Sequence, residues 1–342
     1  AIQEGRWQAV IGTHALIGGG VHFQRLGLCI TDEQHRFGVA QRTALLEKGG
    51  DISTDLAPHL LVMSATPIPR SLALSLFGDL DVSVIDELPP GRQPVKTRLV
   101  PENRRDGLYE FIRQELKAGR QAYIVCPMVE ENGELPDERK AVTAYAEKLQ
   151  KEVLPNRTVR FLHGKMKAKE KETVMRAFAA GEIDVLVSTT VVEVGVDVPD
   201  ASVMLIENAE CFGLSQLHQL RGRVGRGGEQ SYCILMSGEK LSRESRARLE
   251  AMCETNDGFR LAELDLKLRG AGDINGTLQS GMAFDLKIAS PTADVQILTV
   301  SREAAAEILA ADPALAHPQN RGLEALRRRY SGREEIDFSR IS

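Results

Sequence analysis

The chain has 342 residues, of which 42% are hydrophobic and 27% charged, and its formal net charge is −5. This length suits two or three domains with ordinary buried cores, and the charge excludes a protein coated in positive charge, although a local basic surface could still bind nucleic acid. No run of eighteen apolar residues is present, so we expect no membrane span.

The first residues and the cysteines favour a cytoplasmic protein. Residues 1–7 carry neither the basic start nor the apolar stretch of a secretory signal. The five cysteines form no CxxC pair, so we expect buried, reduced thiols and no cysteine-based metal site. The absence of an initiator Met fits a fragment or an engineered chain.

Short apolar runs alternate with helical patterns over the first 240 residues. The candidate strands are Ala9–Gly12, Leu26–Thr31, His59–Ser64, Ala122–Cys126, Thr158–Leu162, Asp184–Ser188, Val203–Glu207 and Ser231–Met236. The candidate helices are Arg104–Ala118, Lys140–Val153, Lys167–Ala180 and Leu214–Arg223. Strands that are apolar throughout are typical of parallel sheets covered on both faces. The alternation therefore predicts an α/β fold.

The segment 88–94, Leu-Pro-Pro-Gly-Arg-Gln-Pro, interrupts this alternation. Three prolines and a glycine in seven residues cannot continue a helix or a central strand. We interpret the segment as an interdomain linker and divide the chain into residues 1–92, 93–240 and 241–342. The last part is predicted to be helical, with a glycine-rich stretch at Arg269–Gly281.

Two adjacent carboxylates, Asp32 and Glu33, follow the predicted strand Leu26–Thr31 directly. The carboxyl end of a strand is where α/β sheets bind their ligands. One carboxylate can hold Mg²⁺ on a nucleotide, and the other can orient or deprotonate the attacking water. On its own, the tetrapeptide Asp-Glu-Gln-His is more often a solvated turn, so its interpretation depends on the rest of the sequence.

Further motifs accompany this tetrapeptide in a fixed order. They are Gly12–His14 before it, then Ser64–Pro67, Thr189–Asp197 and Gln219–Arg226. The ordered set resembles motifs Ic, II, III, V and VI of superfamily 2 helicases. Residues 32–39, 64–70 and 85–92 narrow the resemblance to the RecG family. Residues 256–270 and 276–281 resemble the TRG region, which RecG shares with the transcription-repair coupling translocase; that enzyme usually has a different tetrapeptide at motif II.

The RecG resemblance implies two RecA-like α/β lobes with parallel sheets, the first incomplete, followed by a helical TRG segment. It implies an ATP-dependent helicase that translocates on double-stranded DNA and remodels branched DNA, such as stalled forks and Holliday junctions, in recombination and repair. ATP and Mg²⁺ are the expected cofactors. The expected partners are DNA and the missing N-terminal part of the same protein, with its wedge domain and P-loop.

The resemblance also implies roles for individual residues. The expected catalytic residues are Asp32, which would also hold the metal, Glu33, Arg223 and Arg226. The expected nucleotide-binding residues are Gly195, Asp197 and Gln219. The residues expected to bind DNA, or to couple DNA contacts to the nucleotide, are Thr13, His14, Ser64, Thr66, Thr189, Arg269 and Gln279.

Arginine chemistry suits the motif VI positions. A planar guanidinium can neutralise the charge that spreads over phosphate oxygens, and such an arginine can contribute a factor of about 10³ or more in rate. In isolation these residues fit a solvated basic helix equally well; motif V nearby favours the catalytic interpretation. The run Arg327–Arg329 could touch phosphates, but we interpret it as a solvated helix face.

A P-loop requires the pattern G-x-x-x-x-G-K-[ST]. The one Gly-Lys pair here is Gly164-Lys165, which is followed by Met166 and belongs to the second lobe. The family resemblance places the P-loop upstream of residue 1. We therefore expect no catalysis by these 342 residues alone.

Two alternative functions remain open at this stage. One is the transcription-repair coupling translocase, whose partner is RNA polymerase. The other is a non-catalytic DNA-binding or interaction fragment, which nucleotide binding would distinguish from a motor.

Overall fold

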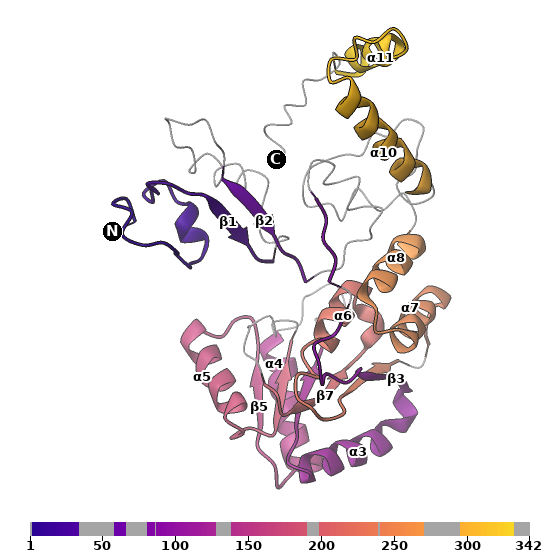
Figure 1. Ribbon diagram of the computed structural model, residues 1–342. Coiled ribbons are helices and arrows are strands. Elements are labelled where there is room, and N and C mark those ends of the chain that lie inside the picture. Colours follow the sequence, from indigo (N-terminus) through magenta and orange to yellow (C-terminus); the bar gives the residue numbers. More distant parts are fainter. Residues whose placement is uncertain are drawn as a thin grey trace. The chain divides into compact units, whose positions relative to one another are not determined.

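The computed structural model describes residues 2–33, 58–65, 81–85, 87–127, 138–189, 198–238, 240–269 and 295–331. The chain divides into two compact units (Figure 1). The first unit comprises residues 1–83 and 269–342, and the second comprises residues 84–268. The three-part division suggested by the sequence stays a prediction.

The second unit is built on a six-stranded, fully parallel sheet in the order β3-β8-β7-β4-β6-β5. The strands in this order are β3 (Lys96–Pro101), β8 (Tyr232–Ser237), β7 (Ala201–Ile206), β4 (Gln121–Val125), β6 (Val185–Ser188) and β5 (Val159–Leu162). The chain moves outward from β4 to β5, returns through β6, and then crosses to the other side of β4. The strand order therefore reverses between β4 and β7, the position where open α/β sheets usually bind ligands.

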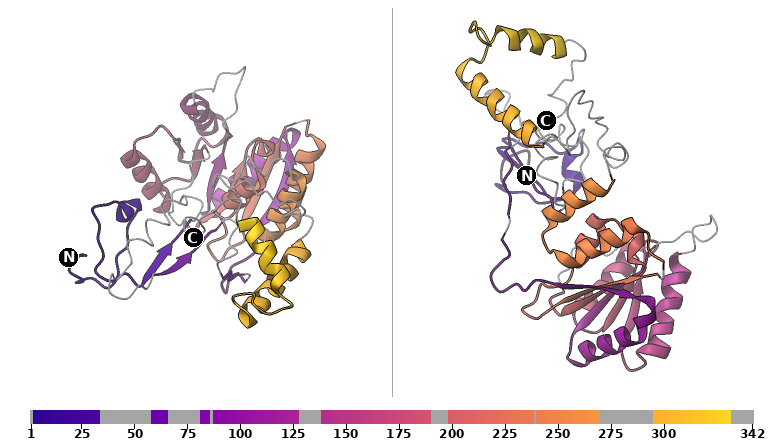
Figure 2. Two further views of the ribbon diagram at one scale, coloured as in Figure 1. Left: turned by 90° about the horizontal axis from the view of Figure 1, so that it is seen from above. Right: turned by 90° about the vertical axis from the view of Figure 1, so that its right-hand side faces the viewer.

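Helices cover both faces of this sheet (Figure 2). One face carries α3 (Arg105–Lys117), which follows the short 3-10 helix η3 (Glu102–Arg104), and α4 (Glu138–Lys148), which ends in one π-helical turn, η4 (Leu149–Val153). The other face carries α5 (Ala168–Ala179), α6 (Leu214–Arg221), α7 (Arg243–Glu254) and α8 (Gly258–Arg269).

Successive side chains of a strand point to opposite faces of the sheet, so each strand contributes to the core on both faces. In β4, Ala122 and Ile124 belong to the core under α3 and α4, whereas Tyr123 and Val125 belong to the core under α5 to α8. All five β4 residues are buried. This three-layer arrangement confirms the predicted α/β fold with a parallel sheet.

The first unit contains a parallel pair, β1 (Leu28–Thr31) and β2 (His59–Val62), and a 3-10 helix, η1 (His14–Ile17). It also contains the helices α10 (Val295–Ala311) and α11 (Arg321–Ser331). Cys29 and Thr31 are buried, whereas Leu28 and Ile30 on the opposite face are more than half exposed.

Most of the expected elements are present, with two differences. The predicted strand Ala9–Gly12 was wrong: no described strand pairs with this segment, Ile11 is fully exposed, and η1 begins two residues later. Strand β3 was missed because Lys96 and Arg98 break the apolar pattern that marked the other strands. Past Ser237, the described residues form helices and no strand, as expected.

Within the described part of the chain, no helix is both long and apolar enough to cross a membrane. All five cysteines are free thiols; Cys29 and Cys233 are buried, whereas Cys211 is exposed.

Candidate functional site

The carboxylate pair lies at the carboxyl end of β1. Asp32 is exposed, and its Oδ1 accepts a hydrogen bond from the Glu33 backbone N–H at 2.8 Å. Glu33 has a φ of 54°, a left-handed conformation that costs a non-glycine residue about 1–2 kcal/mol. Backbone strain of this kind is concentrated at functional sites. An exposed carboxylate at a strand end fits the oxygen ligands that Mg²⁺ prefers.

Ser64 is brought to the same edge of the first unit's sheet. Strands β1 and β2 are parallel and in register from Leu28–His59 to Thr31–Val62. The pairing continues one step further, because the Met63 N–H donates to the Thr31 carbonyl at 2.8 Å. The predicted motif II carboxylates and motif III serine therefore follow neighbouring strand ends.

Thr13 and His14 lie on a separate segment of the first unit. Thr13 precedes η1, and its carbonyl accepts a hydrogen bond from the Leu16 N–H at 3.0 Å. Both Thr13 and His14 are exposed. Their side chains are therefore accessible to a ligand, as the predicted DNA contact requires.

Thr189 lies at the carboxyl end of β6 in the second unit, beside His163 at the end of β5. The Thr189 N–H donates to the Leu162 carbonyl at 3.3 Å, which joins the two strand ends. Both side chains are buried, and Thr189 Oγ1 and His163 Nδ1 lack a hydrogen-bond partner among the residues described. Buried polar atoms are normally paired, so these two mark a candidate ligand contact.

Sequence reasoning did not select His163. Its side chain is 4% exposed and stacks on Phe161, with ring centroids 5.9 Å apart. The available signal was the neighbouring Gly164-Lys165 pair, which was expected to belong to the second lobe, but the sequence alone could not tell that this histidine is buried beside Thr189.

The position where the strand order reverses, between β4 and β7, is filled by an ion pair. Glu207 accepts hydrogen bonds from both terminal nitrogens of Arg105, at 2.7 and 2.8 Å, and one from the Tyr145 hydroxyl. Burial and the Glu207 carboxylate raise the pKa of Tyr145 far above its usual range, so this hydroxyl stays a donor. The position usual for ligands in such sheets is thus occupied by the protein's own side chains.

The motif VI residues lie on α6 and the turn that follows it. Gln219 is half-buried on α6, Arg223 is half-buried just beyond it, and Arg226 is exposed. Arg226 Nε donates to the Gly222 carbonyl at 3.4 Å. Between the two arginines, Val224 is fully buried and Gly225 has a φ of 79°. The turn therefore keeps Arg223 and Arg226 at or near the surface, with Val224 buried between them.

Arg221, only two residues before Arg223, has a purely structural environment. It is 3% exposed, and its Nη1 donates to the Met252 and Thr255 carbonyls at 2.9 and 2.8 Å. Its Nη2 lies 3.0 Å from His218 Nδ1. Burial, reinforced by the Arg221 charge, lowers the pKa of His218 to about 4. The neutral imidazole can then accept the hydrogen bond from Arg221.

Residues of the predicted linker hold the motif VI loop. Arg92 Nε donates to the Gly225 carbonyl at 2.9 Å, and Gln93 Nε2 donates to the Gly228 carbonyl at 3.2 Å. In return, Gln230 Nε2 donates to the Pro94 carbonyl at 2.9 Å. A Cβ on Gly225 would lie 2.8 Å from the Val95 side chain, so only glycine fits there.

Sequence reasoning identified this segment only as a linker, because backbone acceptors more than 130 residues away leave no local pattern. The three prolines at 89, 90 and 94 were the only available hint that the segment has a defined path.

The candidate residues of the second unit form two separate groups. Thr189 lies at the carboxyl ends of the strands, whereas the motif VI loop lies against residues 92–96, at the amino ends of β3 and β8. Pro199, two residues after Asp197, lies against this loop, since a Cβ on Gly227 would come within 2.7 Å of its carbonyl oxygen.

Thr66, Gly195, Asp197 and Gln279 lie outside the described residues. Arg269 is the last residue of α8, and its side chain is not described. Asp32, Glu33 and Ser64 belong to the first unit, and Gln219, Arg223 and Arg226 to the second.

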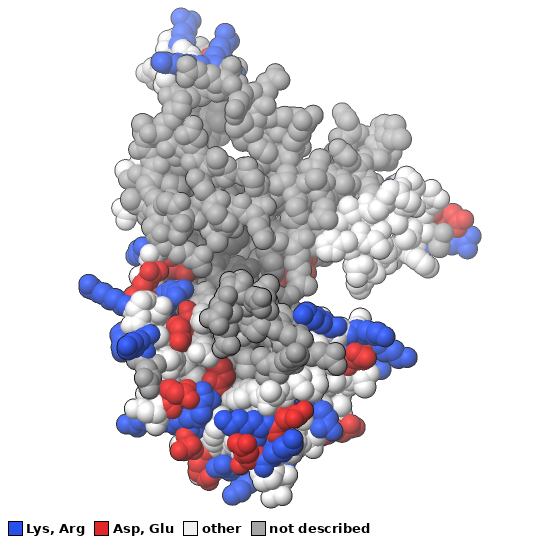
Figure 3. All heavy atoms as spheres, turned by 180° about the vertical axis from the view of Figure 1, so that it is seen from behind, with Lys and Arg blue, Asp and Glu red and all other residues white. Residues whose placement is uncertain are grey.

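On the face seen in Figure 3, charges of both signs are interspersed over the second unit. On α11, Arg327 and Arg328 both pair with Glu324 at 2.7 Å. These internal pairs agree with the interpretation of this run as a solvated helix face.

Two family models match the chain. The model "Helicase conserved C-terminal domain" matches residues 104–228, and "ATP-dependent DNA helicase RecG, domain 3, C-terminal" matches residues 255–342. The first match spans strands β4 to β7 of the second unit and motif VI, and the second spans the predicted TRG region and the C-terminal helices.

Whole-chain comparisons point the same way. The chain is 52% identical to the ATP-dependent DNA helicase RecG of Synechocystis sp. over 318 residues, which is 93% of this chain and 37% of that protein. It is also 52% identical to the protein of that name from Thermotoga maritima, over 90% of this chain and 38% of the relative. The chain thus spans less than half the length of these curated relatives.

A solved structure described as RecG bound to a three-way DNA junction matches with a TM-score of 0.65 and 47% identity. The match covers 87% of this chain and 37% of the other. The similarity of fold to that structure therefore extends over most of this chain.

Proposed function

Because this chain belongs to the RecG family of ATP-dependent DNA helicases, we propose that it is the C-terminal motor part of an enzyme that uses ATP to translocate on double-stranded DNA. The proposed substrates are branched DNAs, such as stalled forks and Holliday junctions, and the proposed place of action is the cytoplasm. A relative bound to a three-way junction supports this substrate class. The transcription-repair coupling translocase is not favoured, because the C-terminal family match is to RecG.

The observation that carries this proposal is that each unit holds one kind of side chain suited to phosphate chemistry: carboxylates in the first and arginines in the second. The first unit carries exposed Asp32 and strained Glu33 at a strand end, and the second carries Arg223 and Arg226 on a braced turn. Neither group is complete alone: carboxylates can hold a metal and activate water, whereas guanidinium groups neutralise charge on the transferred phosphoryl group.

The proposed cofactors are ATP and Mg²⁺. Asp32 would hold the metal, which when bound neutralises charge on the phosphates. Glu33 would orient or deprotonate the attacking water, and Gly195, Asp197 and Gln219 would contact the nucleotide. Arg223 and Arg226 would act on charge that develops on the phosphoryl group in the transition state.

Coupling to DNA is proposed for Thr13, His14, Ser64, Thr66 and Thr189, with Arg269 and Gln279 in the TRG region. The four residues of this set whose side chains the structure describes, Thr13, His14, Ser64 and Thr189, lie at exposed positions or at strand ends. Burial of the unpaired Thr189 hydroxyl beside His163 supports a contact at that strand end.

The test is unwinding of a synthetic replication fork by the whole protein. We expect unwinding with ATP and Mg²⁺, none with a non-hydrolysable ATP analogue, and none for Glu33→Gln. The polypeptide of residues 1–342 should show no DNA-stimulated turnover near one per second, the lower end of typical enzyme rates. Fork unwinding that survives Glu33→Gln would contradict the proposed mechanism.

A further inference from the structure

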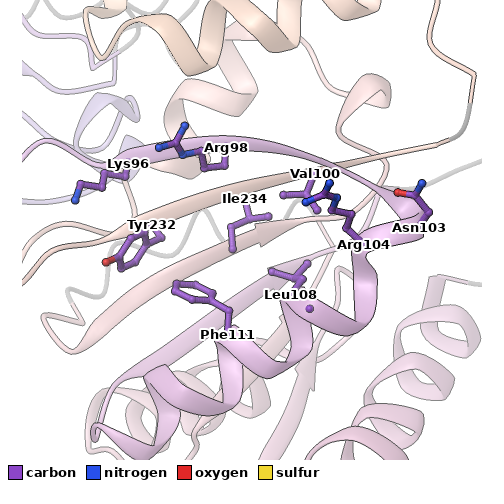
Figure 4. A pocket seen from close by; sticks show the side chains of 10 residues that line it. Lys96, Arg98, Val100, Asn103, Arg104, Leu108, Phe111, Tyr232 and Ile234 are labelled. Atoms are coloured by element: carbon purple, nitrogen blue, oxygen red, sulfur yellow. The ribbon is translucent and has the colours of Figure 1, made fainter.

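An open groove runs beside the edge strand β3 of the second unit, on the face of the sheet that carries α3 (Figure 4). Its volume is about 790 Å³, within the range of pockets that bind ligands. The lining residues are Lys96, Arg98, Val100, Asn103, Arg104, Gly107, Leu108, Phe111, Tyr232 and Ile234. The groove takes no part in the motor chemistry proposed above.

The floor of the groove is apolar. Leu108 and Ile234 are buried at its base, and Val100 and Phe111 are partly buried beside them. Phe111 and Tyr232 meet edge to face, with ring centroids 5.0 Å apart. Bulky apolar side chains from another molecule would be removed from water here, at about 25 cal/mol for each Å² buried.

The rim of the groove is cationic. Lys96, Arg98 and Arg104 are exposed, none forms an ion pair with a described residue, and none of the ten lining residues is acidic. By contrast, other arginines of this unit have carboxylate partners, such as Arg113 with Glu110 and Arg120 with Glu115. The groove is therefore a local site of uncompensated positive charge on a chain with net charge −5.

The three cations are spread along the groove and do not converge on one point (Figure 4). Lys96 and Arg98 lie two residues apart on one face of β3, about 7 Å by strand geometry, and Arg104 lies beyond the strand's end. A single small anion would need converging donors. A row of cations over an apolar floor instead complements a chain that carries several carboxylates and bulky apolar side chains.

We propose that this groove binds an acidic peptide segment of a partner protein, with apolar side chains anchored on the floor and carboxylates facing the rim. Among the strands that the structure describes, β3 pairs only with β8, so its other edge can also hydrogen-bond an extended peptide. Exposed charges can protect an edge strand from aggregation, but that role does not require an apolar hollow beside them. Nucleic acid could use the cations and stack on Phe111 and Tyr232, but the aliphatic part of the floor, Val100, Leu108 and Ile234, would have no counterpart on it.

The test begins with selection of random displayed peptides on the 342-residue chain, followed by fluorescence anisotropy with synthetic labelled versions. We expect selected peptides to combine Asp or Glu with bulky apolar residues. Arg98→Glu and Arg104→Glu should each weaken binding about tenfold or more, a change of about 1.4 kcal/mol per factor of ten. Binding should also weaken with added salt.

Arg243→Glu is the matched control, because Arg243 is exposed on α7, which packs on the other face of the sheet; it should leave binding unchanged. Circular dichroism should show that each variant is folded. The proposal is overturned if selection returns no acidic–apolar peptides, or if charge reversal at Arg98 and Arg104 leaves their affinity intact. It is also overturned if only a single-stranded oligonucleotide binds in a way that depends on Arg98.

Discussion

Three arginines within six residues of one motif have different environments, and this difference defines what each can do. Arg221 is buried and bonded to backbone carbonyls of α7. Arg223 is half-buried and has no ion-pair partner in the described chain, whereas Arg226 is exposed at the end of a glycine turn. Only Arg223 and Arg226 are accessible at the surface, so the phosphate-binding role of these two residues stays a prediction.

Arg226→Ala in the whole protein should lower kcat for ATP by about 10³ and leave ATP affinity comparatively unchanged. The reason is that a guanidinium at this position acts mainly on charge that appears in the transition state. Steady-state ATPase measurements and equilibrium nucleotide binding check this. Equal losses of binding and turnover would assign Arg226 to ground-state binding or folding.

Arg92→Ala should lower kcat by roughly tenfold to a hundredfold, because small misplacements of catalytic groups cost factors of this size. The Arg92 side chain holds the Gly225 carbonyl at 2.9 Å, one residue before Arg226. Arg160→Ala, at an exposed arginine on the opposite edge strand β5, is the matched control. In an Arg226→Ala background, Arg92→Ala should have little further effect; a full additional loss would mean that Arg92 acts elsewhere.

At the scale of elements, α6 is joined to the end of α7 through Arg221 and His218. The folded-state pKa of His218 is about 4, below the ordinary value of 6.5. The unfolded chain therefore takes up a proton first as the pH falls. Stability from this group is fully present above pH 6.5 and is lost as the pH falls towards 4, by up to about 3 kcal/mol.

Denaturant unfolding of the 342-residue chain between pH 7 and 4 checks this expectation. His218→Gln keeps an acceptor for Arg221 but cannot be protonated, so it should flatten the dependence between pH 6.5 and 4.5, above the range of most carboxylates. An unchanged slope in this variant would show that other groups cause the acid sensitivity.

The elements that could be predicted are strands that are buried on both faces, because most residues in such a strand are apolar. Strands β4 to β8 are apolar because both faces are covered, and their positions were predicted to within two residues. The edge strand β3 could not be found this way, since an uncovered edge tolerates Lys96 and Arg98. The segment Ala9–Gly12 was predicted to be a strand because it is apolar, but no described strand pairs with it.

The TRG loop, outside the described residues, gives a prediction from sequence alone. Gln279→Ala in the whole protein should impair fork unwinding far more than ATP hydrolysis. Gln279 lies between Gly276 and Gly281, which permit close backbone approach to a partner. Both activities must be measured at the same salt concentration, because phosphate contacts are strongly salt-dependent. A proportional fall in both would indicate a role in DNA affinity alone.

At the scale of the whole molecule, the sequence predicted which residues belong to the candidate site, from the order of the motifs. It did not predict which of these residues lie close together. Motif order located Asp32, Glu33, Ser64, Thr189, Arg223 and Arg226. The contribution of Arg92 and the burial of His163 beside Thr189 depend on contacts between distant parts of the chain, which a single sequence does not reveal. The central claim of the proposed function is that Glu33 and Arg226 act on the same step of ATP hydrolysis.

A double-mutant cycle of ATP hydrolysis tests that claim most directly. The whole protein would carry Glu33→Gln in the first unit, Arg226→Ala in the second, or both, and single-turnover hydrolysis would be measured with forked DNA. Each single change should slow hydrolysis by about 10³, and the double variant should be little slower than the worse single variant, because groups acting on one transition state are not additive. Losses that multiply to about 10⁶, as expected for independent sites, would contradict the proposal that Glu33 and Arg226 act on the same step of ATP hydrolysis.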